Sequence, residues 1–282
     1  MSSLTNTQHF DKDAAIGVFD SGIGGLSVLK HLRAQLPKEK WLYIADSDYT
    51  PYGEKSDEEI IARCIKITDF FIAQNIKALV VACNTATAAA AAVLRQRYPE
   101  LILVAMEPGL KPAALHSQSK VVGVLATQST LRSNKFKLLQ QTLSQETQVQ
   151  FIPQACVGLV NEIEKGNLAA NEIIELIHRY VPPLLAQNVD HLVLGCTHYP
   201  FVAHIIEKLI VETLGTAHNV KLIDTGEAVA RRLAHLLETK KLLGSSGENE
   251  VLARATGSTS TLQLALSFVM DTTDVLAQSV SL

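Results

Sequence analysis

The sequence has few cysteines, and they form no metal-binding pattern. Cys64, Cys83, Cys156 and Cys196 make no CxxC pair and no close group with histidine. A structural zinc site or a thioredoxin-like motif requires such spacing, so the sequence indicates neither. In a reducing cytoplasm we expect all four side chains to be free thiols.

The sequence also lacks an excess of basic residues and a long uninterrupted apolar run. Its formal net charge is -3 and 47% of its residues are apolar, which is typical of a globular protein rather than of one that coats nucleic acid. The most apolar segment, residues 78–94, is interrupted by Asn84, Thr85 and Thr87, so it predicts no membrane span. The start, MSSLTNTQHFDKDAA, has no apolar core of a secretory signal. We therefore expect a cytoplasmic protein whose main partner is neither nucleic acid nor a membrane.

Short apolar runs alternate with longer amphipathic segments along the first half of the chain. The predicted strands are AIGVFD (15–20), WLYIAD (41–46), ALVVAC (78–83) and LILVAM (101–106). This alternation predicts an α/β fold with mostly parallel sheets and helices on both faces. In such folds ligands bind at the carboxyl ends of the strands.

The second half of the chain repeats the pattern of the first. KVVGVLAT (120–127) and HLVLGC (191–196) are predicted strands, and the motif GVLATQ echoes the earlier GVFDSG. The two strands that end in cysteine also echo each other. The order suggests two copies of one α/β unit, and hence two similar, pseudo-symmetric domains with the active site in the cleft between them.

The domain boundaries follow from where these patterns fall. A further strand, turn and helix pattern, KLIDTGEAVARRLAHLLE, begins at residue 221, and the chain after it can complete the first sheet. We expect a discontinuous first domain of residues 14–109 and 224–282. The second domain is expected to comprise residues 110–223.

Cys83 and Cys196 each stand where a predicted strand passes into a loop and a helix, and hydroxyl or amide side chains follow them directly. Cys64 and Cys156 lack such companions and fit the commoner role of a small buried hydrophobe. A nearby helix N-terminus favours a thiolate. Two such thiols facing one cleft suit racemisation at a carbon acid, because one removes a proton while the other delivers one to the opposite face. This chemistry requires neither a metal nor pyridoxal phosphate.

Two further side chains are candidates to assist these thiols. His198 follows Cys196 by two residues, and in an extended segment both side chains point the same way. Asp20 can serve beside Cys83, although an aspartate at a strand end is also a common turn or cap residue. The segment DSGIGGLS (20–27) matches neither GxGxxG nor GxxxxGK[ST], so it favours a turn that offers Ser21 and backbone N–H groups to a carboxylate.

Four motifs make the chain resemble the glutamate racemase family, within the cofactor-independent aspartate/glutamate racemase superfamily. They are DSGIGG, PYG, CNTATA and GCTHYP, and the resemblance runs from about Ile16 to residue 229. It implies interconversion of L- and D-glutamate without a cofactor or a metal, supplying D-glutamate for peptidoglycan, cell wall biogenesis and cell shape. It further implies a monomer or a homodimer whose small-molecule substrate is glutamate.

The resemblance also implies roles for individual residues. Cys83 would take the α-proton from D-glutamate with the help of Asp20, and Cys196 would take it from L-glutamate with the help of His198. The expected substrate-binding residues are Ser21, Pro51, Tyr52, Gly53, Asn84, Thr85, Thr127, Thr130 and Thr197. The segment CVGLVNEIE (156–164) departs from the family pattern because it lacks two prolines, so no role is carried over to Glu164.

Three other functions compete with this one. An aspartate racemase would keep both cysteines, but PYG and GCTHYP favour glutamate. A small-molecule binding protein built on two α/β domains needs neither thiol, and a hydrolase with one cysteine needs a single nucleophile. The paired thiols therefore favour the racemase.

Overall fold

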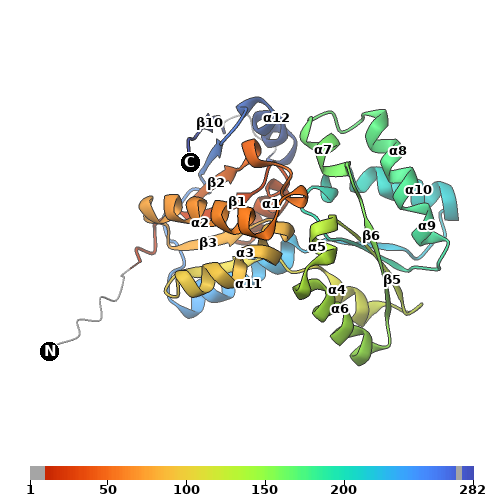
Figure 1. Ribbon diagram of the computed structural model, residues 1–282. Coiled ribbons are helices and arrows are strands. Elements are labelled where there is room, and N and C mark those ends of the chain that lie inside the picture. Colours follow the sequence, from red (N-terminus) through yellow and green to blue (C-terminus); the bar gives the residue numbers. More distant parts are fainter. Residues whose placement is uncertain (1–9, 271–274) are drawn as a thin grey trace.

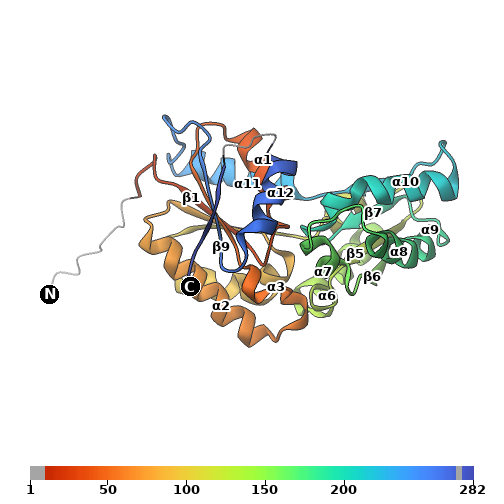
Figure 2. The ribbon, with the colours of Figure 1, turned by 90° about the horizontal axis from the view of Figure 1, so that it is seen from above.

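The computed structural model describes residues 10–270 and 275–282, which form two α/β units lying side by side (Figure 1, Figure 2). The sequence predicts no secretory signal in the segment MSSLTNTQHFDKDAA. Most of that segment, residues 1–9, lies outside the described residues. Each unit contains one sheet, and every strand ladder in both sheets is parallel. The predicted α/β fold with two mostly parallel sheets is therefore confirmed.

The first sheet has six strands, and the side chains of the strands at its centre are buried. Their order is β10 (Ala277–Ser279), β9 (Val251–Ala255), β2 (Trp41–Ala45), β1 (Ile16–Asp20), β3 (Ala78–Val81) and β4 (Ile102–Ala105). One face packs against α1 (Leu26–Gln35), α11 (Gly226–Thr239) and α12 (Thr259–Val269), and the other against α2 (Asp57–Ala73) and α3 (Asn84–Arg97). Two short 3-10 turns, η1 (Ser47–Tyr49) and η2 (Tyr52–Glu54), follow β2.

The second sheet has four strands. Their order is β6 (Gln150–Ala155), β5 (Val121–Ala126), β7 (His191–Leu194) and β8 (Lys221–Ile223). One face packs against α4 (Leu110–His116) and α6 (Asn134–Thr147), with the short α5 (Gln128–Arg132) after β5. The other face packs against α7 (Leu159–Glu164), α8 (Asn171–Tyr180), α9 (Pro182–Leu185) and α10 (Ala203–Leu214), and the 3-10 turn η3 (Tyr199–Val202) leads into α10.

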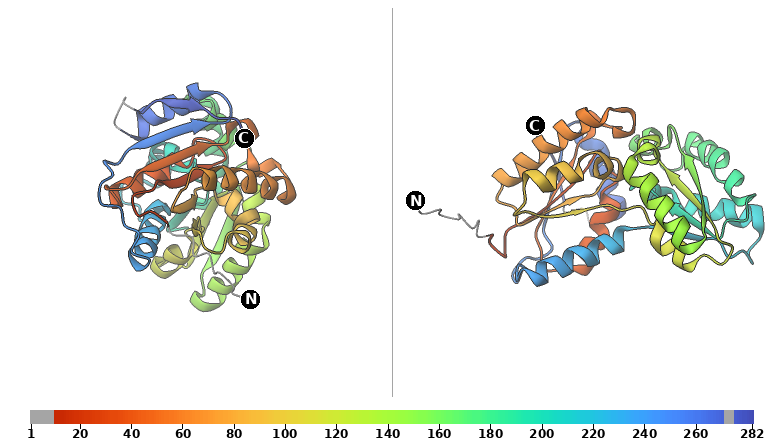
Figure 3. Two further views of the ribbon diagram at one scale, coloured as in Figure 1. Left: turned by 90° about the vertical axis from the view of Figure 1, so that its left-hand side faces the viewer. Right: turned by 60° about the horizontal axis from the view of Figure 1, so that its bottom comes forward.

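Four consecutive strands of the first sheet have the same order as the four strands of the second, which confirms the internal repeat. In the first, β1 lies between β2 and β3, and β4 follows; in the second, β5 lies between β6 and β7, and β8 follows. Cys83 and Cys196 therefore follow equivalent strands, β3 and β7. The carboxyl ends of both sheets turn towards the junction between the units (Figure 3).

A single hydrophobic cluster connects the two units. It contains core residues of α1, α11 and α12 from the first unit, core residues of α7, α8 and α10 from the second, and Ile23 from the loop after β1. The buried side chain of Ile23 belongs to the same cluster as Leu159 and Ile163 of α7. Apolar packing thus holds the loop after β1 close to the second unit.

The C-terminal residues complete the first sheet. Strand β9 pairs with β2 in register from Trp41 opposite Val251 to Ala45 opposite Ala255, and β10 pairs with β9. The loop before β9 is held by Glu39, which accepts the Gly244 N–H at 2.7 Å and pairs with the buried Lys77 ammonium at 2.5 Å. No helix among the described residues is long and apolar enough to cross a bilayer.

Asp190 is expected to contribute to the stability of the second unit. Its carboxylate accepts hydrogen bonds from the Ser117 hydroxyl (2.7 Å), the Gln118 and Ser119 N–H groups (2.6 and 2.8 Å) and His191 Nδ1 (2.9 Å). Burial opposes the charge, but these bonds outweigh it and hold the pKa of Asp190 well below its ordinary value. We expect Asp190→Ala to lower the free energy of unfolding by about 2 kcal/mol at neutral pH.

The pH dependence of this loss provides a control. Because the folded pKa is depressed, the stabilisation is complete above the unfolded pKa of about 3.9 and is lost as the pH falls through the folded pKa. In urea unfolding, the difference between wild type and variant should therefore shrink below about pH 4. A difference that does not change with pH would contradict an ionic contribution.

Candidate active site

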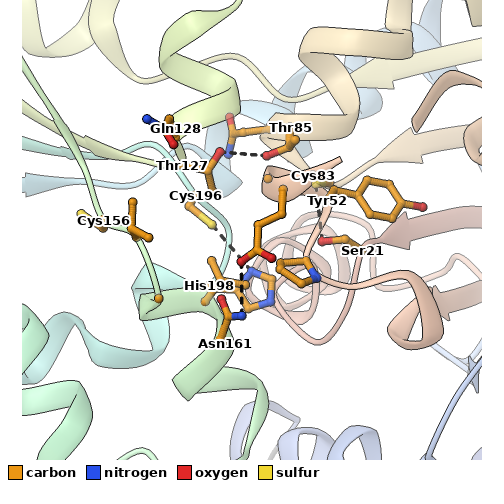
Figure 4. Close-up of a pocket in the computed structure, with 17 residues that line it drawn as sticks. Ser21, Tyr52, Cys83, Thr85, Thr127, Gln128, Cys156, Asn161, Cys196 and His198 are labelled. Atoms are coloured by element: carbon orange, nitrogen blue, oxygen red, sulfur yellow. Dashed lines mark hydrogen bonds between the residues drawn. The ribbon is translucent and has the colours of Figure 1, made fainter. Parts of the chain in front are cut away.

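One pocket is lined by residues of both units, and the two candidate thiols enter it from opposite sides (Figure 4). The predicted site residues that line it are Ser21, Pro51, Tyr52, Gly53, Cys83, Asn84, Thr85, Thr127, Cys196 and His198. The other three, Asp20, Thr130 and Thr197, do not line it but are buried behind it. All four cysteines are free thiols, and Cys64 lies on the buried face of α2.

Cys83 is the N-cap residue of α3. Its extended backbone lets Sγ accept the Ala86 N–H at 3.4 Å, and the thiol donates to Ser21 Oγ at 3.8 Å. The helix N-terminus favours negative charge on the sulfur. Burial and the charge of Asp20 act more strongly, and they raise the pKa of Cys83 well above its ordinary value. The resting side chain is therefore a thiol that needs a nearby proton acceptor.

Asp20, at the end of β1, is placed to be that acceptor. Its carboxylate is fully buried, and burial raises its pKa; the positive charge of His198 lowers the pKa and the negative charge of Glu164 raises it. A carboxylate with a raised pKa accepts a proton more readily. The geometry is consistent with Asp20 assisting Cys83.

The loop after β1 binds carboxylates of the protein itself. Asp20 Oδ2 accepts the Gly22 and Gly25 N–H groups at 3.2 and 3.0 Å, and Glu164 Oε1 accepts the Ile23 N–H at 2.8 Å. The expectation that these N–H groups serve a bound carboxylate ligand is corrected accordingly. Only Ser21 of this loop lines the pocket.

Cys196 has a different set of partners, which begins with His198. The backbone at His198 is helical (φ -77°, ψ -29°) and not extended as the spacing predicted, yet the turn places Nδ1 3.7 Å from Cys196 Sγ. His198 Nε2 lies 2.5 Å from Glu164 Oε1, at the end of α7. Burial disfavours a charged imidazole, but the bonds to Cys196 and Glu164 outweigh it and raise the pKa of His198 well above its ordinary value.

Cys196, His198 and Glu164 thus form a hydrogen-bonded chain in which protons can move. The buried imidazole can pass a proton to the sulfur or take one from it, while the carboxylate stabilises the imidazolium. Cys83 and Cys196 thus lie on opposite sides of the pocket and have different ionisable neighbours, Asp20 for Cys83 and His198 for Cys196. This is the arrangement that proton transfer at two faces of one carbon requires.

Tyr52 forms one wall of the pocket, and its hydroxyl points away from it. The hydroxyl donates to Asp46 Oδ2 at 2.6 Å, and Arg63 Nε and Nη2 also donate to the Asp46 carboxylate, at 2.8 and 2.6 Å. Thr256, after β9, donates to the other carboxylate oxygen of Asp46 at 2.9 Å. This network therefore holds the Tyr52 ring in place against the cavity.

Hydroxyl and amide groups supply the polar side of the pocket. Thr85 Oγ1 lies 3.0 Å from Thr127 Oγ1 and 3.4 Å from Thr130 Oγ1, so this cluster connects the two units. Within the described residues, neither polar atom of the buried Asn84 side chain has a hydrogen-bond partner. An unpartnered buried amide is costly, which is consistent with Asn84 binding a polar ligand.

Several residues of this site were not predicted. Glu54, Gln128, Cys156, Val157, Gly158, Val160 and Asn161 also line the pocket, and Glu164 supports His198 from behind. Glu54 of the first unit and Asn161 of the second are in contact, with Asn161 Nδ2 3.4 Å from Glu54 Oε1. Burial raises the pKa of Cys156 to about 12, so it fits the role of an unreactive core thiol at the pocket edge.

The site offers no cluster of metal ligands. In residues 10–270 and 275–282, no three histidine, cysteine, aspartate or glutamate side chains are grouped so that they could hold a metal ion. The polar side chains that line the cavity carry thiols, hydroxyls, amides, an imidazole and one carboxylate, that of Glu54. These are suited to holding a small polar molecule and to moving protons.

Comparison with known proteins identifies relatives over most of the chain. A family described as Asp/Glu/Hydantoin racemase matches residues 16–233. The glutamate racemase of Ectopseudomonas mendocina is 50% identical over 257 residues, which cover 91% of this chain and 95% of the relative. That of Pseudomonas syringae pv. tomato is 51% identical over 240 residues, covering 85% and 84% of the two chains.

Solved structures give the same result. The glutamate racemase of Francisella tularensis, in complex with D-glutamate, superimposes with a TM-score of 0.80 at 28% identity and covers 96% of this chain and 98% of its own. The Escherichia coli glutamate racemase, in complex with L-glutamate and the activator UDP-MurNAc-Ala, gives a TM-score of 0.78 at 27% identity and covers 95% and 98%. In both its sequence and its fold, the chain belongs to the glutamate racemases of the Asp/Glu/hydantoin racemase family, which are isomerases.

Proposed function

We propose that this protein interconverts L- and D-glutamate by a two-base mechanism in which Cys83 and Cys196 are the bases. The observation that carries the proposal is the placement of two free thiols on opposite sides of one pocket, each beside its own proton acceptor. The solved relatives that hold D-glutamate in one case and L-glutamate in the other support glutamate as the substrate.

The protons balance as follows. With D-glutamate bound, the Cys83 thiolate removes the α-proton, and the Cys196 thiol delivers its proton to the opposite face of the carbanion. When L-glutamate dissociates, Cys83 is protonated and Cys196 is deprotonated. The reverse reaction begins with removal of the α-proton by Cys196 and ends with delivery by Cys83. Asp20 and His198 accept and return the thiol protons between turnovers, so no cofactor is needed.

The rest of the pocket holds the substrate in this scheme. Asn84 and the hydroxyl groups of Ser21, Thr85 and Thr127 bind its charged ends, and the Pro51–Gly53 wall fixes the depth of the cavity. Thr130 and Thr197 act from behind the lining by positioning Thr85 and Asp20, to which they are hydrogen-bonded. This modifies the direct substrate contacts expected of these two residues.

The wider role follows from the family. We propose that the D-glutamate is used for peptidoglycan synthesis in the cytoplasm, and hence in cell wall biogenesis and cell shape, by a monomer or a homodimer. The two sheets support domain boundaries at residues 14–109 with 224–282 and at 110–223. Rescue of a bacterial strain that depends on added D-glutamate would test the cellular role.

The activity is tested with each glutamate enantiomer in deuterated water. We expect chelator-treated protein without added pyridoxal phosphate to abolish the circular dichroism signal of L-glutamate and to introduce one deuterium at the α-carbon. D-glutamate should lose its signal and gain one deuterium in the same way. The aspartate enantiomers, which are one methylene shorter, should react much more slowly. Complete dependence on a metal or on pyridoxal phosphate, or faster racemisation of aspartate, would refute the proposal.

A further inference from the structure

The loop between β1 and α1 contacts the second unit at Gly22 and Gly24. A Cβ atom added at Gly22 would overlap the Glu164 carboxylate, lying 2.5 Å from Cδ and 2.8 Å from Oε2. A Cβ atom added at Gly24 would overlap the His198 ring, lying 2.6 Å from Cε1 and 2.8 Å from Cγ. Real Cβ atoms do not come so close to other heavy atoms, so each glycine leaves space for one of these two side chains.

Backbone conformation does not explain these glycines. Among the described residues, the glycines with positive φ are Gly158, Gly166 and Gly215, and none belongs to this loop. An alanine could adopt the dihedral angles at 22 and 24 without strain. Close approach of the second unit is therefore what requires glycine there.

Hydrogen bonds reinforce this contact. The Ile23 N–H donates to Glu164 Oε1 at 2.8 Å, and the same oxygen lies 2.5 Å from His198 Nε2. Ser27 Oγ donates to the Thr197 carbonyl, next to Cys196, at 2.9 Å. Within the first unit, the buried Tyr43 hydroxyl donates to the Gly22 carbonyl at 2.8 Å. The loop is thus held in place by its own unit while it contacts the acid–base groups of the other.

The two thiols differ in which unit supplies their partners. The partners of Cys83 are Ser21, the Ala86 N–H and Asp20, all from the first unit. The chain of contacts at Cys196 runs through His198 and Glu164 to a loop of the first unit. The base at Cys196 therefore depends on this loop of the other unit, whereas the second unit reaches the partners of Cys83 through a longer hydrogen bond, from Thr197 Oγ1 to Asp20 Oδ1 at 3.4 Å.

We propose that Gly22, Ile23 and Gly24 are positioning residues that hold the His198–Glu164 pair, so that the Cys196 base is complete only when this loop contacts the second unit. The proposal rests on the proposed racemase function and deepens it. Disturbing the loop at residues 22 or 24 should impair proton removal from L-glutamate far more than from D-glutamate.

Racemisation itself cannot reveal this difference. L- and D-glutamate have equal free energies, so the values of kcat/KM in the two directions are equal for every variant. A one-sided reaction is needed. N-Hydroxyglutamate supplies it, because removal of the α-proton and cleavage of the N–O bond release water and leave an imine, which water hydrolyses to 2-oxoglutarate and ammonia.

We expect Gly24→Ala and Gly22→Ala to slow release of 2-oxoglutarate from the L analogue at least about tenfold more than from the D analogue. The matched control is Gly25→Ala in the same loop. A Cβ atom at Gly25 would meet Asp20 Cβ at 2.7 Å and Tyr43 Oη at 3.0 Å, both in the first unit. This control should not slow the L analogue preferentially. Equal losses on both analogues for the two test variants, or no loss, would overturn the proposal.

A second measurement does not depend on activity. The titratable groups that face the His198 imidazole are Cys196, Glu164 and Asp20. NMR titration of labelled histidine should show a lower pKa for His198 in Gly22→Ala than in wild type, because the Glu164 carboxylate is displaced. An unchanged His198 pKa in a folded variant would contradict the positioning role. Failure of wild type to racemise glutamate would refute the proposed function and leave this second result to decide the positioning role alone.

Discussion

Cys83→Ser and Cys196→Ser should each lower the rate of glutamate racemisation about a thousandfold or more, because each removes one of the two groups that must exchange a proton with the α-carbon. A serine hydroxyl is a far weaker acid than a thiol, so it serves poorly either as the base or as the proton donor. The measurement is loss of the circular dichroism signal of each enantiomer. Both variants should lose activity in both directions, because every turnover uses both thiols.

The same variants should keep opposite halves of the chemistry. Elimination of water from N-hydroxyglutamate needs only one base, so Cys196→Ser should retain reaction with the D analogue and Cys83→Ser with the L analogue. Cys64→Ala is the control, because this thiol is on the buried face of α2 and outside the pocket, so its removal should leave both reactions intact. Equal losses on both analogues for both serine variants would show that the thiols are not specific for one face. Full racemase activity in either would refute the mechanism.

Much of the fold could be predicted because parallel α/β proteins reveal their strands as apolar runs. The runs predicted at residues 15–20, 78–83 and 191–196 contain β1, β3 and β7, whose observed bounds are nearly the expected ones. The two cysteine motifs were recognisable because each follows such a run. In this architecture, a residue that follows a buried strand lies at the ligand-binding end by topology alone.

The partners of these residues could not be predicted in the same way. Ile23 and Glu164 are 141 positions apart in the chain, and their hydrogen bond depends on how the two units pack. Without the family prolines, the segment that precedes Glu164 gave no sign that this side chain would reach His198. Tyr52 lines the pocket, but its hydroxyl is bound by Asp46, whose partner Arg63 lies on α2. Such contacts are set by tertiary structure and not by local pattern.

The glycine-rich loop is another case in which the sequence motif could not predict the tertiary contacts. Its glycines suggested a turn that offers N–H groups to a carboxylate, and the structure does place carboxylates there. They belong to Asp20 and Glu164, however, and the residues that fill the space beside Gly22 and Gly24 come from the second unit. A local motif can reveal that backbone is approached closely, but not what approaches it.

Glu164→Gln should slow elimination from the L analogue of N-hydroxyglutamate, which begins at Cys196, by about tenfold to a hundredfold, with little effect on elimination from the D analogue, which begins at Cys83. The amide keeps an oxygen that can accept the Ile23 N–H, so the loop contact survives while the negative charge beside His198 is removed. The bond to Glu164 is one of the causes that raise the pKa of His198, and its loss should bring that pKa down towards the ordinary value.

The pH profile should show this directly, because less of the His198 side chain is protonated at a given pH when its pKa falls. With the L analogue, the limb of the profile that reports His198 should move to lower pH in Glu164→Gln, while the profile with the D analogue keeps its position. Glu162→Gln is the matched control on the same helix, because Glu162 pairs with Lys165 at 2.7 Å and not with His198. If Glu162→Gln shifted the profile equally, or if Glu164→Gln left it in place, Glu164 would have no electrostatic role at His198. A loss confined to the L analogue and accompanied by the shift would assign that role to the carboxylate charge rather than to its shape.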